Sequence, residues 1–190
     1  MPIREDGFRQ NCYYHVFNRG AGRQRIFRDQ ENYRYLLRLI AKHSKEKRVG
    51  IVCYCLLPNH YHMILRQEGD EPISRFINYV FSAYTQAFNR REGRSGTLFQ
   101  GRFKHIIVDR QEYFLHLMRY IHINAVKAGL AEKPEEWDFS DYRLWTASDR
   151  SMAAWASGYG NLLLAERSRR FGENWAFLPP PNIERSWRTI

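Results

Sequence analysis

Two apolar segments separated by only two residues constrain the fold of this chain more than any other feature. The segments VGIVCYCLL at 49–57 and HYHMILR at 60–66 have the composition and patterning of strands, and Pro58 and Asn59 interrupt them. A break this short predicts an antiparallel hairpin, because parallel strands need a crossover of about a dozen residues or more. The chain is therefore expected to build an antiparallel sheet.

The other periodic segments predict a strand and a helix before this hairpin, and a helix, a strand and a further helix after it. They lie at about 12–18, 28–47, 71–93, 104–108 and 110–130. Asp29 is the expected N-cap of the first helix, and Gly129 marks the end of the last. This order predicts an α+β fold with a ferredoxin-like split βαβ core, in which two helices cover one face of an antiparallel sheet and a C-terminal helix is additional.

The charge and length of the chain narrow the class of protein. The 190 residues fit one domain at 1–130 followed by an irregular extension at 131–190, which we expect to pack on the core through its tryptophans and to hold a short helix near 160–171. The net charge of +10 favours a polyanionic partner, with nucleic acid as the first candidate and an anionic membrane surface as the second.

The same residues favour a cytoplasmic protein without a membrane partner. The first ten residues lack the apolar segment of a signal peptide, and no run approaches the ~18 apolar residues of a membrane span. Cys53 and Cys55 alternate within one apolar strand, which is typical of buried, reduced thiols.

The pair His60 and His62 is the first candidate for chemistry. Residues two apart on a strand project from the same face of a sheet, so both imidazoles could bind one divalent metal ion. The alternative is two polar residues at the end of a strand.

Tyr120 and Asn124 stand four apart in the last predicted helix and would share one face of it. A tyrosine can act as a nucleophile, and an asparagine oxygen is a ligand that Mg²⁺ or Mn²⁺ accepts. The alternative places Tyr120 in the core and uses Asn124 as a helix cap.

Four motifs in this order give the chain a family resemblance: YHVFNRG, LLPNHYHMIL, LFQGRFK and YIHINAVKAGL. Over about residues 12–130 the chain resembles the HUH-type single-tyrosine transposases of the IS200-like superfamily, and within them the REP-associated tyrosine transposase-like proteins. The segment WDFSDY also looks like the one that follows in that family. The resemblance implies a catalytic domain at 1–130, with Tyr120 as nucleophile and His60, His62 and Asn124 as ligands of Mg²⁺ or Mn²⁺. Ala125 stands where relatives often have proline.

The reaction implied by this resemblance is metal-dependent cleavage and strand transfer on single-stranded DNA. Tyr120 would attack a phosphorus atom, form a 5′-phosphotyrosine and release a 3′-hydroxyl, beside DNA hairpins and without a nucleotide cofactor. The protein would act as a monomer or a homodimer. Two other readings remain open: a nucleic-acid-binding domain of the same fold without transposition, and a hydrolytic metalloenzyme in which water attacks.

Basic residues near these motifs are the candidates for DNA contact. They are Arg19, Arg23, Arg25, Arg102, Lys104, Arg119 and Lys127. Nearby aromatic residues (Phe27, Phe99 and Phe103) suit single strands, whose bases stack on rings. His15 could support the metal site, but a satisfied strand histidine is the favoured interpretation. His122 is a poor candidate for a base that assists Tyr120, since two residues along a helix put it on another face.

Overall fold

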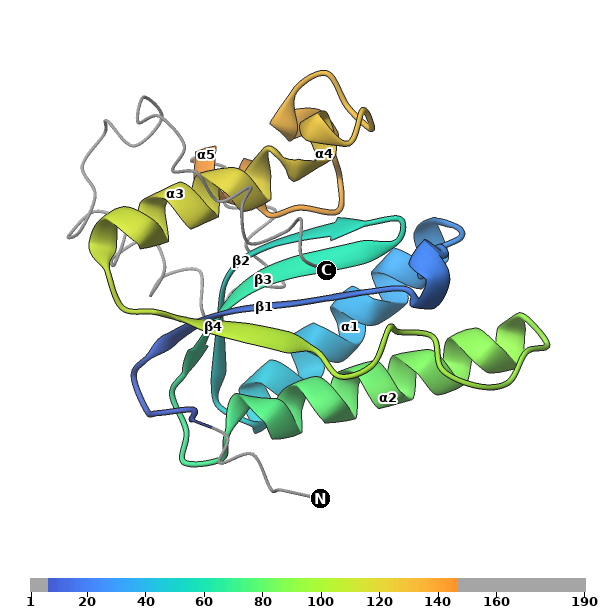
Figure 1. The fold of residues 1–190 in the computed structure, drawn as a ribbon, viewed down its shortest axis with the longest axis horizontal. Coiled ribbons are helices and arrows are strands. Elements are labelled where there is room, and N and C mark those ends of the chain that lie inside the picture. The colour runs from blue at the N-terminus through green and yellow to red at the C-terminus, as the bar shows by residue number, and fades with distance from the viewer. Residues whose placement is uncertain (1–6, 147–190) are drawn as a thin grey trace.

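Four antiparallel strands form one sheet in the order β2-β3-β1-β4 in the computed structural model, which describes residues 7–146 (Figure 1). The strands are β1 (Tyr13–Arg19), β2 (Val49–Leu57), β3 (His60–Gln67) and β4 (Lys104–Val108). The helices are α1 (Gln30–Glu46), α2 (Ile73–Arg91), α3 (Gln111–His122), α4 (Asn124–Lys127) and α5 (Tyr142–Thr146), with short 3-10 helices at Ala21–Arg23 and Pro134–Glu136. The predicted α+β, ferredoxin-like order of elements is confirmed.

The strand register sets up rows of side chains across the sheet. β1 pairs with β3 and with β4, so Phe17 lies opposite His62 on one side and opposite Lys104 on the other. In the next row, Arg19 lies opposite His60. Because directly paired residues project from the same face, these rows bring Arg19 beside His60 and place Lys104 on the same face as His62, on the far side of Phe17.

The sheet is the middle layer of three. Helices α1 and α2 cover one face, and α3 crosses the other (Figure 1). Strand alternation sorts the side chains of β3 between the two faces: Tyr61 and Met63 join the core under α1 and α2, whereas Ile64 joins the core under α3. His62, one residue from Tyr61, therefore faces α3.

Local signals explain where α1 begins and ends. Asp29 is its N-cap and accepts a hydrogen bond from the Asn32 amide at 3.0 Å, as predicted. The chain then reverses at Arg48, which has a positive φ of 51°, and enters β2 directly.

The prediction of one continuous helix over 110–130 is wrong near the site, where the helix is interrupted. α3 ends at His122, Ile123 has φ −84° and ψ 0°, and α4 begins at Asn124. Tyr120 and Asn124 thus lie on either side of an interruption rather than on one continuous helix. Gly129 follows the last turn with a positive φ of 67°, as its predicted role in ending the helix requires.

The segment after residue 130 packs on the edge strand β2. The Trp137 indole donates to the Leu56 carbonyl oxygen at 2.9 Å, and Trp145 is buried against α3. The helix expected near 160–171 lies outside the described residues. Cys53 and Cys55 are buried and form no disulfide, as predicted, and burial raises the pKa of both thiols. None of the helices within residues 7–146 is long and apolar enough to span a membrane.

Candidate active site

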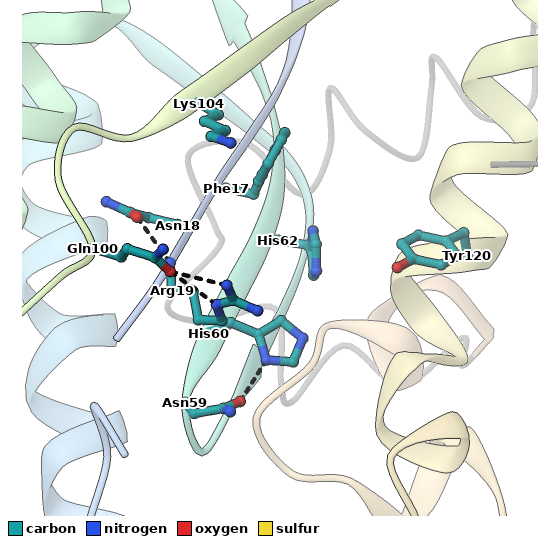
Figure 2. A pocket seen from close by; sticks show the side chains of 9 residues that line it. All are labelled: Phe17, Asn18, Arg19, Asn59, His60, His62, Gln100, Lys104 and Tyr120. Atoms are coloured by element: carbon teal, nitrogen blue, oxygen red, sulfur yellow. Dashed lines mark hydrogen bonds between the residues drawn. The ribbon is translucent and has the colours of Figure 1, made fainter. Parts of the chain in front are cut away.

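A cavity of about 290 Å³ opens where the β2–β3 turn, the end of β1 and α3 meet (Figure 2). Its walls come from segments far apart in the sequence. The lining residues are Phe17, Asn18, Arg19, Asn59, His60, His62, Gln100, Lys104 and Tyr120. The fold thus brings the predicted nucleophile and two of the predicted metal ligands to one place.

His60 and His62 present their rings to this cavity at a right angle, with centroids 5.2 Å apart. The Nδ1 of His60 lies 2.7 Å from Asn59 Oδ1. An amide oxygen only accepts, so Nδ1 carries the proton and Nε2 presents a lone pair. Fixing one ring nitrogen in this way is how proteins orient a metal-binding histidine.

His15 reaches His62 from the neighbouring strand. Its Nε2 lies 3.1 Å from His62 Nδ1, and both side chains are buried. Sequence analysis favoured a satisfied strand histidine, and the partner that satisfies it is His62, a candidate metal ligand. With Nδ1 held by His15, the nitrogen of His62 that can bind a metal is Nε2.

Burial controls the charge of these three imidazoles. It lowers the pKa of His15 to about 3 and, together with the positive charge of Arg19, that of His60 to about 4. Burial, with His15 and His60 nearby, also lowers the pKa of His62 well below its ordinary value. All three are neutral at pH 7, which is the form that binds metals.

Tyr120 faces the histidines from the last turn of α3. Its hydroxyl points across the cavity toward them (Figure 2), and its ring lies edge-on to His62 with centroids 5.7 Å apart. The Lys127 ammonium lies 5.2 Å from the centroid of the Tyr120 ring. The predicted nucleophile, two imidazoles and a cation therefore converge.

Asn124 is buried at the start of α4, with 7% of its surface exposed, and is not among the residues that line the cavity. The alternative of a helix cap is not observed, because Ile123 holds the N-cap position and Asn124 is the first residue of α4. Its buried Nδ2 has no hydrogen-bond partner within the described part of the chain. The metal-binding atom would be Oδ1, and the role of Asn124 as third ligand stays a prediction.

Residues 7–146 contain no group of three or more His, Cys, Asp or Glu side chains that could hold a metal ion. A metal at this cavity would therefore depend on the two imidazoles together with a carboxamide or substrate oxygen. Neutral imidazoles with fixed Nδ1 atoms fit that requirement.

The predicted DNA-contacting residues divide into two groups. Arg19 and Lys104 line the cavity, and Lys127 stands over Tyr120. The others, Arg23, Arg25, Arg102 and Arg119, do not line it. Phe27 is 1% exposed and stacks on Tyr33 in the core, so the prediction that it stacks on bases is wrong.

His122 points away from the cavity, as predicted. Its Nε2 lies 3.0 Å from Asp141 Oδ1, and both groups are buried. Asp141 also accepts from the Tyr54 amide at 2.8 Å and the Trp145 indole at 3.0 Å. This carboxylate ties α3 to β2 and so helps to position Tyr120.

Sequence reasoning missed Asn59, Gln100 and Asp141. Asn59 carried a signal, since it immediately precedes His60, but it was interpreted only as a turn residue. Gln100 accepts from Arg19 Nε and Nη2 at 3.3 and 2.9 Å across 81 residues, and no local pattern marks such a contact.

A family model described as "Transposase IS200 like" matches residues 8–124. The REP-associated tyrosine transposase of Escherichia coli K12 is 28% identical over 137 residues, which cover 71% of this chain and 79% of that protein. A protein of Haemophilus influenzae described as "Putative REP-associated tyrosine transposase" is 30% identical over 102 residues. That match covers 48% of this chain and 57% of the relative.

A solved structure of a REP-associated tyrosine transposase bound to a REP hairpin has the same fold. It superposes with a TM-score of 0.60 and 23% identity, covering 75% of this chain and 83% of the other.

Proposed function

The chain belongs to the transposase IS200-like family, and on that basis we propose that it cleaves and rejoins single-stranded DNA through a covalent 5′-phosphotyrosine on Tyr120. The observation that carries the proposal is the Tyr120 hydroxyl facing His60 and His62 across one cavity. Nothing in a purely structural role requires a phenol to face two neutral imidazoles there.

In the proposed step, Tyr120 Oη attacks the phosphorus atom of a backbone phosphate. A bond forms between Oη and phosphorus, and the bond from phosphorus to the 3′-oxygen breaks. The phenol proton leaves to solvent or a base, and the departing 3′-oxygen takes up a proton as a 3′-hydroxyl. The phosphotyrosine keeps the phosphoryl group activated, so another 3′-hydroxyl can reverse the step and join two strands.

His60 and His62 would hold a divalent ion, Mg²⁺ or Mn²⁺, through their Nε2 atoms, and Asn124 is the candidate for a further ligand. When bound, such an ion polarises a non-bridging phosphate oxygen and holds the phosphate in place. His15 and Asn59 orient the two imidazoles for this purpose.

Cations of the chain would hold the phosphate and its neighbours. Lys104 and Arg19 lie on the sheet side of the cavity, and Lys127 lies on the tyrosine side. Positive charge on both sides suits a strand that passes between the sheet and α3. The REP-associated relative bound to a REP hairpin supports the proposal that this chain also acts beside hairpins.

The test is a covalent adduct. The protein is incubated with hairpin DNA that carries single-stranded flanks, in Mn²⁺, and resolved on a denaturing gel. We expect a band of protein linked to DNA that disappears in Tyr120→Phe. Tyr113→Phe is the matched control, because Tyr113 is a half-buried tyrosine on the same helix that does not line the cavity.

The remaining readings give different outcomes. An adduct that persists in Tyr120→Phe overturns the assignment of the nucleophile. Cleavage without any adduct favours the hydrolytic reading, and DNA binding without cleavage favours a binding domain that lacks transposition. Adduct formation that is undiminished in His62→Ala, or in a chelator, removes the metal from the proposal.

A further inference from the structure

A second cavity, of about 500 Å³, lies between α2 and the loop 97–103 that leads into β4. Its volume falls within the roughly 300–1,000 Å³ of pockets that hold small organic groups. Asn18 lines both this cavity and the tyrosine cavity, so the two are neighbours separated by the end of β1. We call the second cavity the α2 groove.

The floor and one wall of the α2 groove are aromatic. Tyr61 and Phe81 stack with centroids 4.3 Å apart and an interplanar angle of 12°, and both are buried. Phe99 stands edge-on to Phe81 at 5.4 Å, and Phe103 completes the wall. Phe99 and Phe103 are only partly buried, so part of each ring lies at the surface of the groove.

The opposite wall is polar. Asn78, Ser82 and Gln86 recur every four residues along α2, are exposed, and line the groove. Their amides and hydroxyl can donate and accept hydrogen bonds. Arg102 stands exposed at the rim, and within residues 7–146 no acidic residue lines the groove.

The loop that forms the aromatic wall is held in place by the end of β1. The backbone N–H of Gln100 donates to the backbone carbonyl oxygen of Arg19 at 2.8 Å. The side-chain Nδ2 of Asn18 donates to the Gly101 carbonyl oxygen at 3.1 Å. Gly101 has a positive φ of 90°, which suits glycine and turns the chain toward β4. The groove is therefore formed before any ligand arrives, and its position relative to the tyrosine cavity is fixed.

We propose that the α2 groove binds one unpaired nucleotide of the same DNA strand, with its base against Phe99 and Phe103 and its phosphate on Arg102. An aromatic face opposite hydrogen-bonding side chains is what an unstacked base requires, since its faces stack and its edges bond. The positive charge of Arg102, with no acidic residue among the described residues of the lining, favours an anionic ligand over a neutral or basic one. This inference rests on the proposed function, because it takes DNA as the substrate.

Photo-crosslinking tests the position of the base without knowledge of the target sequence. The probe is a DNA hairpin with thymidine tails in which one thymidine at a time is replaced by 5-iodouracil, bound to the full chain carrying Tyr120→Phe. We expect one or two adjacent positions to crosslink to the peptide that contains Phe99 or Phe103. Crosslinks confined to peptides outside the groove would overturn the proposal.

Affinity measurements test whether the base contributes to binding. Replacing the crosslinking nucleotide by an abasic residue should weaken binding about 5- to 100-fold, the effect of losing one stacked base. The same replacement should have a smaller effect in Phe103→Leu, because one of the two rings proposed to contact the base is gone. Gln86→Ala, at an exposed helix position, gives a second variant that keeps the fold and should weaken binding of a base-containing tail only.

A matched pair of arginine variants separates a local contact from general charge. Arg102→Gln should weaken binding of the tailed hairpin more than Arg90→Gln, which removes the same charge from an exposed site on α2 outside the groove. Equal losses in the two variants, or abasic effects that persist undiminished in Phe103→Leu, contradict the inference.

The two proposals can fail separately. A wild-type protein that forms the tyrosine adduct but shows no dependence on the groove retains the proposed function and loses this inference. Conversely, a protein that forms no adduct but shows base-dependent binding that Phe103→Leu reduces loses the proposed function and retains this inference.

Discussion

His15 on β1 and His62 on β3 are joined by a hydrogen bond of 3.1 Å between Nε2 and Nδ1, in the interior of the sheet. This contact makes His15 part of the support of the candidate metal site, although it lies outside the cavity itself.

Replacing His15 by phenylalanine should therefore weaken metal binding without removing a ligand. Phenylalanine keeps the ring and fills the space, but it leaves His62 Nδ1 without this partner. Loss of such an orienting partner typically costs about 10- to 100-fold in metal affinity. Titration with Mn²⁺ checks this, and His43→Phe on α1 serves as the control that should leave the affinity unchanged. Unchanged affinity in His15→Phe contradicts the supporting role.

Asp141→Ala should destabilise the fold by at least about 3 kcal/mol in the free energy of unfolding. It removes the hydrogen-bond acceptor of the Tyr54 amide, the His122 ring and the Trp145 indole, and each such loss at a buried polar group costs about 1–3 kcal/mol. Asp138→Ala is the matched control: Asp138 pairs with Arg143 at the surface, where an ion pair contributes about 0–1 kcal/mol. Urea denaturation of the two variants measures both values, and equal losses would contradict the role assigned to Asp141.

Lys104→Gln should change the salt dependence of DNA binding. A contact to one phosphate of a single strand contributes about −0.7 to the slope of log affinity against log salt concentration, so the slope should become shallower by about that amount. Lys42→Gln, at an exposed position of α1, should leave the slope unchanged. Binding isotherms at four salt concentrations check the prediction. A slope that moves equally in both variants would show that Lys104 makes no specific phosphate contact.

The stability of the metal-free protein should fall as the pH falls from about 6.5 toward 4. The pKa values of His15 and His60 are lowered to about 3 and about 4, and that of His62 is lowered as well. In this window the unfolded chain therefore binds protons that the folded chain does not. Each such group lowers the free energy of unfolding by up to about 1.4 kcal/mol per pH unit.

Urea denaturation at pH 7, 6 and 5 measures this dependence. His15→Phe should show a shallower decline than wild type, because one of the three groups is gone. A free energy of unfolding that is constant over this range would contradict burial of neutral imidazoles.

The order of elements and the face of the histidines could be predicted, because both follow from local periodicity. The hairpin at Pro58 and Asn59, the split βαβ order and the common direction of His60 and His62 need only strand alternation. The placement of Tyr120 beside His62 could not be obtained in this way. It was expected from the family resemblance, and the packing of α3 on the sheet brings the two together.

Contacts that depend on register or on distant packing were missed. His15 meets His62 because β1 and β3 pair with Phe17 opposite His62, and a slip of one residue would turn His15 to the other face. Asp141 meets Tyr54 across 87 residues. The interruption at Ile123 also escaped prediction, since the sequence there keeps an apolar periodicity and contains neither glycine nor proline.

The position of β3 inside the sheet separates two timescales of motion. β3 is hydrogen-bonded on both sides, whereas α3 is joined to the sheet by side-chain packing and by the Asp141 contacts. Amides of an interior strand exchange with solvent only when most of the structure opens, while an outer helix can detach in a smaller fluctuation. The geometry of His60 and His62 can therefore persist while the helix that carries Tyr120 moves away and returns.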